Sequence, residues 1–423
     1  MKKSNDSRED ASSDIIIIGA SIAGNYLAYL LKDSGLNIRV FEEHKSVGQP
    51  LECAGIVSSK LSKIMRVPNH LVLNRVSSAK IFGPVGKSIS MRTKDKPLVI
   101  DRVGLDKHYY KKAREGGVIY HLGEKVIDIK DDKDHVLVKT KGGLFKASMI
   151  VGCDGANSLV AHKKGIKNEL LVGKQVIVEV NMENNPHGLS TDECELHFNP
   201  RWNNLFGWVI PIEKNKFRIG LASRKNVSRH FKDFIQDRFK DTIDNIEGKD
   251  FKVINTTGGT LPVGLLKNAA FNRMILLGDS CCQVKATTGG GVVMLAIAAK
   301  YAANTIIAAF KRRNFSKAFL LKHYQGKCRD TIGFTLKIHY VIHLGLRVLN
   351  RSDFTFLFSL AHHPAIKKKL MQSADMDFPL AFLLKILLYP KFYAWLSKFL
   401  IRNLSVLKKT LIVLLGNKEA SAD

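Results

Sequence analysis

Short runs of apolar, β-branched residues alternate with helical patterns at the start of the chain. The run Ile15-Ile16-Ile17-Ile18 has the composition of a strand buried on both faces of a parallel sheet. A glycine-containing turn follows, then residues 25–32 carry leucines at helical spacing, and Gly35 ends that helix. Residues 37–41 form a second short apolar run. These segments predict a βαβ unit with a right-handed crossover onto a parallel sheet.

The pattern changes between residues 166 and 265. Short apolar stretches separated by turn residues occur there at 176–180, 194–198, 207–211 and 217–221, which is typical of an antiparallel sheet. Residues 274–279 return to the buried-strand pattern, and a long apolar helix follows Gly291. From about residue 330 onward the pattern is helical. The predicted class is α/β, with a Rossmann-type domain interleaved with an antiparallel-sheet domain and followed by a helical C-terminal region.

Composition narrows the class of protein and its partners. The 423 residues are 45% hydrophobic, which excludes a disordered or collagen-like chain and predicts two or three domains. The net charge of +28 predicts a partner that is negative in bulk, such as nucleic acid, an anionic membrane surface or an acidic protein. We find no aromatic-basic RNA motif and no DNA-reading helix, so we expect no nucleic-acid partner.

The six cysteines form no CxxC pair and no Cys/His cluster at zinc spacing, so we expect reduced thiols, an intracellular protein and no metal site. The first 13 residues are polar and of mixed charge, which is unlike a signal peptide. No stretch of 18 or more residues is both free of charge and predominantly apolar. Membrane contact is therefore expected to be peripheral.

The turn of the first βαβ unit has the pattern of a dinucleotide-binding motif. Gly19 permits the tight bend, Gly24 permits close helix packing, and the helix start at Ala20 and Ser21 faces the pyrophosphate. Ser21 stands where the motif usually has its middle glycine. Glu42, at the end of the second strand, is placed to accept hydrogen bonds from ribose hydroxyls. The alternative is an ordinary βα connection.

Two later segments indicate which dinucleotide is bound. Residues 152–158 read GCDGANS after one strand, and Gly278-Asp279-Ser280 follow another. Together with the first turn, they resemble the three fingerprints of flavoprotein hydroxylases and their reductase relatives, which bind FAD. That resemblance places Asp279 at the flavin ribityl chain and the helix start at 287–291 toward the isoalloxazine ring. Amides and the positive end of a helix dipole stabilise negative charge there.

Two motifs narrow the resemblance further. Residues 50–55 read PLECAG, and residues 278–292 read GDSCCQVKATTGGGV. Both resemble motifs of the geranylgeranyl reductase family, particularly its archaeal branch acting on digeranylgeranylglycerophospholipids. The likeness spans residues 14–300 in fingerprint order. The Cys53-Ala54-Gly55 segment is one residue shorter than the family's common form.

The resemblance implies roles for individual residues. Cys53 becomes a candidate proton donor or relay near the flavin. Residues 206–211 resemble the family's aromatic motif lining the lipid cavity, which gives Phe206, Trp208 and Pro211 as substrate-binding candidates. The same segment partly resembles a motif of flavin halogenases, and ordinary sheet packing is its structural alternative. The implied FAD-binding residues are Gly19, Ala20, Ser21, Gly24, Glu42, Cys53, Ala54, Arg102, Val126, Asp279, Gly290, Gly291 and Val292.

With these motifs, the chain divides into interleaved segments. The FAD-binding domain is expected in three parts, 14–75, 101–165 and 266–330, after a disordered N-terminus at 1–13. The substrate domain is expected to comprise residues 76–100 and 166–265. Residues 331–423 are expected to form a helical region that includes an amphipathic basic helix.

The C-terminal tail gives a separate signal. From residue 378 to 418 there is no acidic residue among 41 positions, while seven are Lys or Arg. If residues 391–415 form one helix, Lys391, Lys398, Arg402 and Lys409 share one narrow stripe opposite a broad apolar face. Such a helix suits an anionic membrane interface. The alternative is a helix packed on the protein's own core.

The expected function is therefore FAD-dependent reduction of C=C bonds in geranylgeranyl chains of an archaeal-type ether phospholipid. The implied partners are an isoprenoid lipid, an anionic membrane surface and an external electron donor, whether ferredoxin, a deazaflavin or NADPH. A cytoplasmic enzyme peripherally associated with the membrane is expected. The alternatives are a flavin-dependent monooxygenase of an aromatic or isoprenoid substrate, and a membrane-associated flavin electron-transfer protein without its own substrate.

Overall fold

The structure is a computed structural model of the whole chain. It describes residues 12–415 apart from positions 85, 87, 93–95, 184, 186, 203–204, 241–250, 266–267, 374–376, 379 and 388. The expected disordered segment at 1–13 lies outside the described residues except for Ser12 and Ser13. These two belong to the first strand, which begins three residues before the expected start at Ile15.

The first sheet has five parallel strands in the order β18-β11-β1-β2-β8. Short β17 pairs antiparallel with β18 at one edge, and a hairpin of β9 and β10 extends β11. The bounds are β1 Ser12–Ile18, β2 Ile38–Glu42, β8 Ile119–Leu122, β9 Val126–Asp131, β10 Val136–Thr140, β11 Leu144–Gly152, β17 Ala270–Phe271 and β18 Met274–Leu276.

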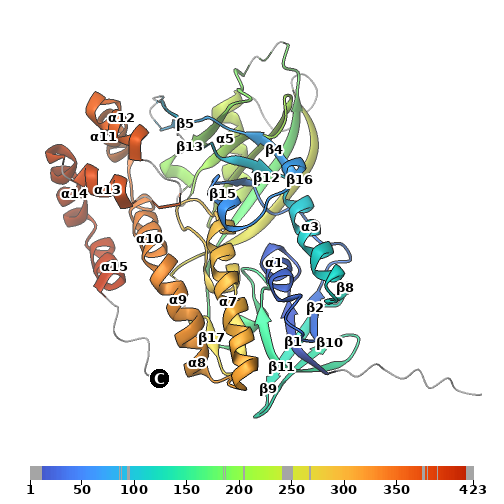
Figure 1. Cartoon of the computed structure of the whole chain (residues 1–423). Helices are drawn as coiled ribbons and strands as arrows, with labels where there is room; N and C mark the ends of the chain where they lie inside the picture. Colours follow the sequence, from blue (N-terminus) through green and yellow to red (C-terminus); the bar gives the residue numbers. More distant parts are fainter. Residues whose placement is uncertain are drawn as a thin grey trace, which may run out of the picture.

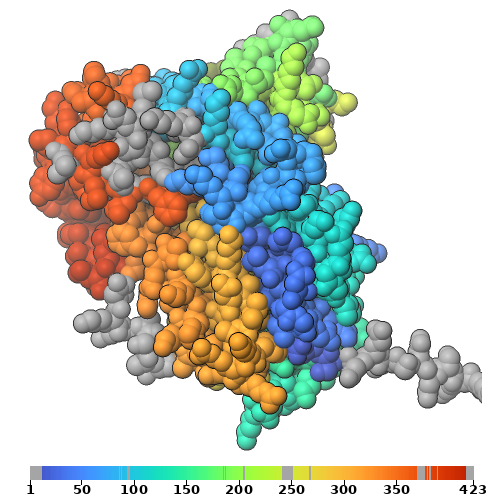
Figure 2. All heavy atoms as spheres, viewed as in Figure 1, coloured from blue at the N-terminus to red at the C-terminus, as the bar shows by residue number. Residues whose placement is uncertain are grey.

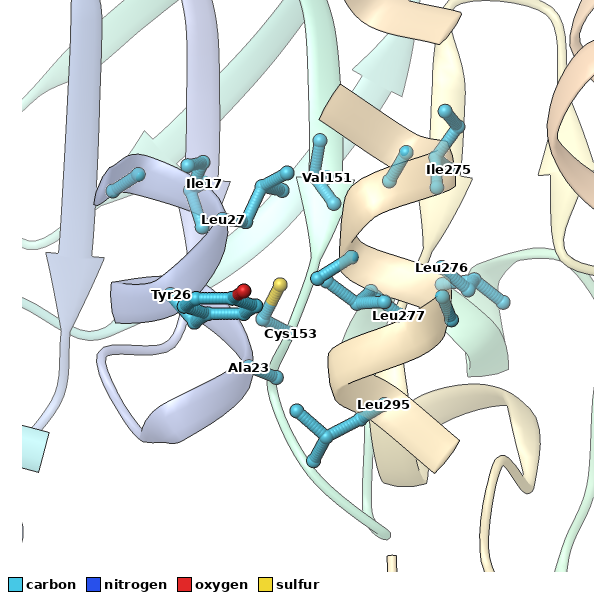
Figure 3. Packing of buried hydrophobic residues seen from close by; sticks show 14 of the residues in the cluster. Ile17, Ala23, Tyr26, Leu27, Val151, Cys153, Ile275, Leu276, Leu277 and Leu295 are labelled. Carbon is cyan, nitrogen blue, oxygen red and sulfur yellow. The ribbon is translucent and has the colours of Figure 1, made fainter. Parts of the chain in front are cut away.

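Helices cover this sheet and enclose the main core. They are α1 (Ile22–Leu31), α3 (Arg102–Glu115) and α7 (Val292–Arg312), with α1 packed against both others. Figure 3 shows side chains of α1, such as Leu27, beside Val151 of β11 and Leu295 of α7. The β-branched run of β1 is fully buried here, and each such side chain stabilises the fold by about 1.5–3 kcal/mol.

Helix α7 is the one described helix that is long and apolar enough to cross a membrane by length and composition. Of its most apolar window, 67% is buried inside the protein, where the helix packs on α1 and on α2 (Leu61–Ile64).

The second sheet has seven strands in the order β16-β12-β15-β14-β13-β5-β6. It is antiparallel except that β13 runs parallel to β5, so the expected purely antiparallel sheet is mixed. The parallel pair arises because β5 comes from the early segment at 78–82 and joins the edge of strands from 169–263. The bounds are β5 Ser78–Phe82, β6 Ser88–Arg92, β12 Glu169–Val180, β13 Glu193–His197, β14 Gly207–Pro211, β15 Lys216–Ser223 and β16 Phe251–Val263.

Helix α5 (Val227–Phe239) covers one face of the second sheet with the buried rings of Phe231 and Phe234. A small third sheet, in the order β3-β7-β4, lies at the start of α3. Figure 1 shows the two large sheets one above the other, with helices along one side. The remaining bounds here are β3 Ile56–Val57, β4 Val72–Arg75, β7 Leu98–Ile100, α4 Leu159–Lys163 and the short 3-10 helices η1 Asn69–Leu71, η2 Pro200–Trp202 and η3 Gly278–Cys281.

Beyond α7 the described chain is helical. An almost continuous helical segment runs from Lys317 to Leu346 and includes two π-helical turns. Its parts are α8 Lys317–Leu320, η4 Leu321–Gln325, α9 Gly326–Cys328, η5 Arg329–Gly333 and α10 Phe334–Leu346. The last helices are α11 Arg351–His362, α12 Pro364–Ser373, α13 Leu380–Leu387, α14 Pro390–Arg402 and α15 Leu404–Leu415.

The stretch 391–415, expected as one helix, forms two, because the backbone leaves the helical region at Asn403 (φ −121°, ψ 58°). The Asn403 side chain donates to the Phe399 carbonyl at 2.8 Å and so satisfies one carbonyl of the last turn of α14. The single straight stripe of basic residues expected over both helices is therefore interrupted.

Part of the expected apolar face of α14 packs on the protein itself. Phe399 is 4% exposed and, with Trp395, packs against α11 and β6. Buried Asp353 of α11 accepts a hydrogen bond from Trp395 Nε1 at 3.1 Å and pairs with Arg402 Nη2 at 2.5 Å. Arg402, whose side chain is 48% exposed, therefore forms an internal ion pair, whereas Lys391 and Lys398 are exposed.

Candidate functional site

The turn between β1 and α1 is shaped by two glycines. Gly19 has φ +100°, and a Cβ there would lie 2.4 Å from the Cys153 carbonyl oxygen. A Cβ at Gly24 would lie 1.9 Å from the Gly19 oxygen, so neither position tolerates a side chain. Ser21 is the N-cap of α1 but makes no side-chain cap hydrogen bond. The first-turn amides of α1 are therefore available to an anion.

Glu42 lies at the carboxyl end of β2, beside this turn. Its Oε2 accepts a hydrogen bond from the Ala20 amide at 2.7 Å, and its Oε1 accepts one from the His44 amide at 3.0 Å. The Glu42 carbonyl accepts from the Glu124 amide at 2.8 Å, and Val126 begins β9 two residues later. Ala20, Glu42 and Val126, all predicted to contact the nucleotide, therefore lie at one edge of the sheet.

Arg102 lies in a buried ion pair at the start of α3. Its Nη1 lies 2.9 Å from Asp106 Oδ1, and both side chains are under 8% exposed. The guanidinium also hydrogen-bonds to the Cys53 thiol. Burial acts to lower the pKa of Arg102, but the attraction of Asp106 and Cys53 outweighs it and raises that pKa. Arg102 therefore carries a fixed positive charge beside Cys53.

The loop at residues 50–55, called the Cys53 loop below, is bound by side chains of the second sheet. Gln175 of β12 donates to the Cys53 carbonyl at 3.3 Å, and Arg218 of β15 donates to the Ala54 carbonyl at 2.8 Å. Gly55 has φ +71°, and a Cβ there would lie 2.1 Å from Arg218 Nη1. Cys53 is half-buried at the junction of the two sheets.

Asp279 follows β18 and lies beside the start of α7. A Cβ at Gly291 would lie 3.4 Å from Asp279 Oδ1, so this glycine lets the carboxyl approach the helix closely. Burial raises the pKa of Asp279 to about 6; the charge of Arg102 opposes the shift and that of Glu52 adds to it. Gly291, the N-cap of α7, brings no side-chain cap, which leaves amides of Val292 and its neighbours free for a ligand.

A second buried ion pair flanks the glycine turn before α7. Lys285 Nζ lies 2.6 Å from Asp377 Oδ1, and both side chains are almost fully buried. A Cβ at Gly290 would lie 3.1 Å from Lys285 Cε, so this pair lies against the turn. Thr287 Oγ1 lies 2.6 Å from Nδ1 of His339 on α10, which ties the same turn to the C-terminal helices.

The three substrate candidates lie on or beside β14 but are not brought together. Phe206 and Trp208 have ring centroids 6.5 Å apart, in an apolar cluster that also contains Tyr340 of α10. Pro211 is at the other end of β14, where it pairs with Phe217, and its carbonyl accepts from Asn74. The structure thus groups Phe206 and Trp208 and leaves Pro211 apart.

The carboxyl ends of the parallel strands therefore bring together the glycine turn, Glu42, Arg102 and Asp279, with the Cys53 loop across them. Free helix-start amides, a carboxylate at the end of β2 and a cradle closed to any Cβ fit a dinucleotide. The sequence did not single out Gln175 and Arg218, which lie 122 and 164 positions from the loop residues they bind. Lys285 lay in a quoted motif, but its partner Asp377 is 92 positions away.

The fold and this arrangement define the class of protein: a mixed α/β chain with the architecture of FAD-dependent hydroxylases and geranylgeranyl reductases. The family described as lycopene cyclase protein matches residues 14–359. The chain belongs to the lycopene cyclase/geranylgeranyl reductase family.

Curated relatives are distant but extend over most of the chain. A digeranylgeranylglycerophospholipid reductase of Methanosarcina mazei is 25% identical over 371 residues, which cover 82% of this chain and 88% of that protein. An uncharacterized protein of Methanocaldococcus jannaschii is also 25% identical, over 77% of this chain and 81% of that one.

Solved structures share the fold. A geranylgeranyl bacteriochlorophyll reductase-like protein of Thermoplasma acidophilum gives a TM-score of 0.78 at 18% identity, covering 92% of this chain and 99% of that chain. A p-nitrophenol 4-monooxygenase of Pseudomonas putida gives 0.66 at 17%, covering 88% and 98%. A flavin halogenase solved in complex with FAD gives 0.59 at 12%, covering 97% and 93%.

The raised pKa of Asp279 predicts a pH-dependent stability of the apoprotein. Because the pKa rises from an ordinary 3.8 to about 6, the contribution of Asp279 is fully present below about pH 4 and is lost as pH rises through 6. The shift corresponds to at most roughly 3 kcal/mol, and to less where water reaches this half-buried carboxyl.

Asp279→Asn should therefore be more stable relative to the wild-type apoprotein at pH 8 than at pH 4. Urea unfolding of both proteins across this range measures the difference in free energy. A difference that does not change with pH would contradict the assignment of the titrating carboxyl.

Proposed function

We propose that this protein is an FAD-dependent reductase that saturates C=C bonds in geranylgeranyl chains of archaeal-type ether phospholipids. The observation that carries the proposal is the Cys53 loop, held across a dinucleotide-type site and beside an apolar cluster. The motifs around this loop and at 278–292 resemble geranylgeranyl reductases. Relatives named digeranylgeranylglycerophospholipid reductase, at 24–25% identity over three quarters or more of the chain, support the same substrate class.

The residues named above fit FAD as the bound group. First-turn amides of α1 would hold the pyrophosphate, Glu42 the ribose, and Asp279 the ribityl chain. When bound and reduced, the flavin would supply the hydride for alkene reduction, and two electrons from an external donor such as ferredoxin, a deazaflavin or NADPH would restore its reduced form. The amides at Gly291 and Val292, at the positive end of α7, would stabilise negative charge next to them.

The alkene in this reaction is not polarised by a carbonyl group, so catalysis depends on positioning and on a nearby acid. We assign the acid or its relay to Cys53, whose thiol is oriented by Arg102 and whose backbone is fixed by Gln175 and Arg218. Phe206 and Trp208 would form an apolar wall beside the isoprenoid chain of the substrate. Excluding water there keeps the proton transfer directed at the substrate.

The central test is anaerobic turnover. The purified protein with FAD and dithionite should convert a digeranylgeranylglycerophospholipid into products heavier by two hydrogens per saturated bond, as read by mass spectrometry. A flavin-loaded protein that instead consumes oxygen with NADPH would establish the monooxygenase alternative, whose fold it shares. Bound flavin without turnover of either kind would leave the electron-transfer alternative and refute the reductase.

Cys53→Ala should slow alkene reduction per bound flavin by ~10²-fold or more, the range for loss of a positioned acid. Flavin absorbance measures cofactor content, and single-turnover kinetics measure the reduction step. Cys194→Ala is the matched control, since that thiol is 4% exposed and buried in an apolar cluster of the second sheet. Normal rates with Cys53→Ala would contradict the acid role.

We also propose that helices α13 to α15 dock the enzyme on an anionic membrane at the cytoplasmic face. Large apolar side chains are exposed on them, including Ile401 (70%) and Leu404 (64%) at the break between α14 and α15. Exposed Lys391, Lys398 and Lys408 flank these positions. Figure 2 shows these helices (red) on one flank of the molecule.

The double variant Ile401→Asp/Leu404→Asp should lose ~10-fold or more of its binding to vesicles containing anionic lipid, because two apolar contacts are replaced by repelled charges. Co-sedimentation with phosphatidylglycerol-containing vesicles measures the binding, and pure phosphatidylcholine vesicles should bind less wild-type protein. Ile307→Asp, at an exposed position of α7, is the control. An equal loss in the control variant would contradict docking through α14 and α15.

A further inference from the structure

A basic cavity lies in the second domain, away from the glycine turn. Its volume is about 570 Å³, and it is bounded by the start of α5, the end of β15 and the end of α10. Four of its seven lining residues are permanently cationic. The residues are Arg201, Trp202, Arg224, Lys225, Asn226, His230 and Arg347.

The carboxylates beside the basic cavity do not balance its charge. Glu169 lies 3.2 Å from Arg347 Nη1 and 3.5 Å from Arg224 Nη1, so one carboxylate is shared by two guanidiniums. Asp237 pairs with Arg201 at 2.6 Å. Two acidic groups therefore hold three arginines in place, and Lys225 adds a further positive charge. An excess of positive charge in a concave site raises the local concentration of anions.

The basic cavity also has hydrogen-bond donors to spare. Asn226, the N-cap of the 13-residue α5, has a left-handed backbone (φ +55°) and makes no side-chain cap hydrogen bond, so first-turn amides of α5 are open. Trp202 is 2% exposed, yet its indole Nε1 has no partner among the described residues. The buried Nδ1 of His230 likewise has none within that part of the chain. Such unpaired groups cost stability unless a ligand satisfies them.

Helix α10 connects the basic cavity to the cofactor turn. His339, near the middle of α10, contacts Thr287 of the turn, and Arg347, the C-cap of that helix, lines the basic cavity. Eight residues of helix separate them, a rise of about 12 Å. Between them, Tyr340 joins the apolar cluster of Phe206 and Trp208. Helix α10 therefore contacts the cofactor turn, the apolar cluster and the basic cavity, in that order along its length.

We propose that the basic cavity binds the phosphate-bearing head group of the lipid substrate, whose isoprenoid chain lies along this apolar wall toward the cofactor turn. This inference rests on the reductase function proposed above and adds the basis of substrate choice. Guanidiniums and amides suit phosphate oxygens, because charge-assisted and bidentate hydrogen bonds to them are strong. A phosphate anchored at the basic cavity fixes which double bonds of the chain reach the site of reduction.

The test separates the head group from the chain. Arg224→Gln and Lys225→Gln should raise KM for a digeranylgeranylglycerophospholipid ~10-fold or more, the value of a lost charge-assisted hydrogen bond, and leave reduction of geranylgeraniol unchanged. Lys214→Gln removes one exposed charge from the same domain and serves as the control. Reduction of both substrates with wild-type KM values in the two variants would overturn the inference.

A binding measurement keeps the inference testable if no substrate is reduced. Calorimetric titration of the wild-type protein with glycerol phosphate should show binding that Arg224→Gln weakens and Lys214→Gln preserves. Inorganic phosphate run alongside distinguishes a general phosphate site from one that also recognises the glycerol. If the wild-type protein reduces the lipid but binds neither probe, the head-group site is wrong while the reductase stands. If it binds glycerol phosphate but reduces no lipid, the site stands without that reaction.

Discussion

The hydrogen bonds that Gln175 and Arg218 make to the Cys53 loop are the interaction on which the rest of the site depends. These donors come from the second sheet, whereas the glycine turn, Glu42 and Asp279 come from the first. The two hydrogen bonds to backbone carbonyls of the loop thereby fix the position of one sheet relative to the other. Because Gly55 leaves no room for a Cβ beside Arg218, the loop and the guanidinium fit in one arrangement.

This arrangement concentrates charge where little water enters. Arg102 is enclosed with Asp106 and hydrogen-bonds to Cys53, so one guanidinium serves both the FAD-binding segments and the loop. A buried charge is tolerated only when it is paired, and each cation at the junction has a carboxylate or a carbonyl as its partner. The carboxyl of Asp279 differs from these cations, because burial raises its pKa and disfavours its charged form. It is therefore suited to a neutral hydrogen-bonding partner.

Sequence patterns predicted the parts of the site that lie close together along the chain. The β1 turn, α1 and Glu42 have short-range signals, and the Ala20–Glu42 hydrogen bond follows from the βαβ geometry. Gln175 and Lys285 were not identified as part of the cradle, because their partners arrive through tertiary packing that no period encodes. The break at Asn403 was missed for the opposite reason: the hydrophobic period continues through it, while a local side-chain hydrogen bond ends the helix.

The net charge of +28 is the excess of 66 Lys and Arg over 38 Asp and Glu, and internal ion pairs do not reduce it. Several carboxylates, such as those of Asp106, Asp353 and Asp377, are enclosed and bound to cations inside the fold. Each of these pairs removes one positive charge together with one negative charge, so the excess of lysine and arginine over acidic residues is left for the rest of the protein. A positive surface next to exposed apolar side chains favours a ligand that is both anionic and hydrophobic. The positive charge alone fitted nucleic acid, an anionic membrane surface or an acidic protein, and the exposed apolar side chains beside it are compatible with an anionic lipid.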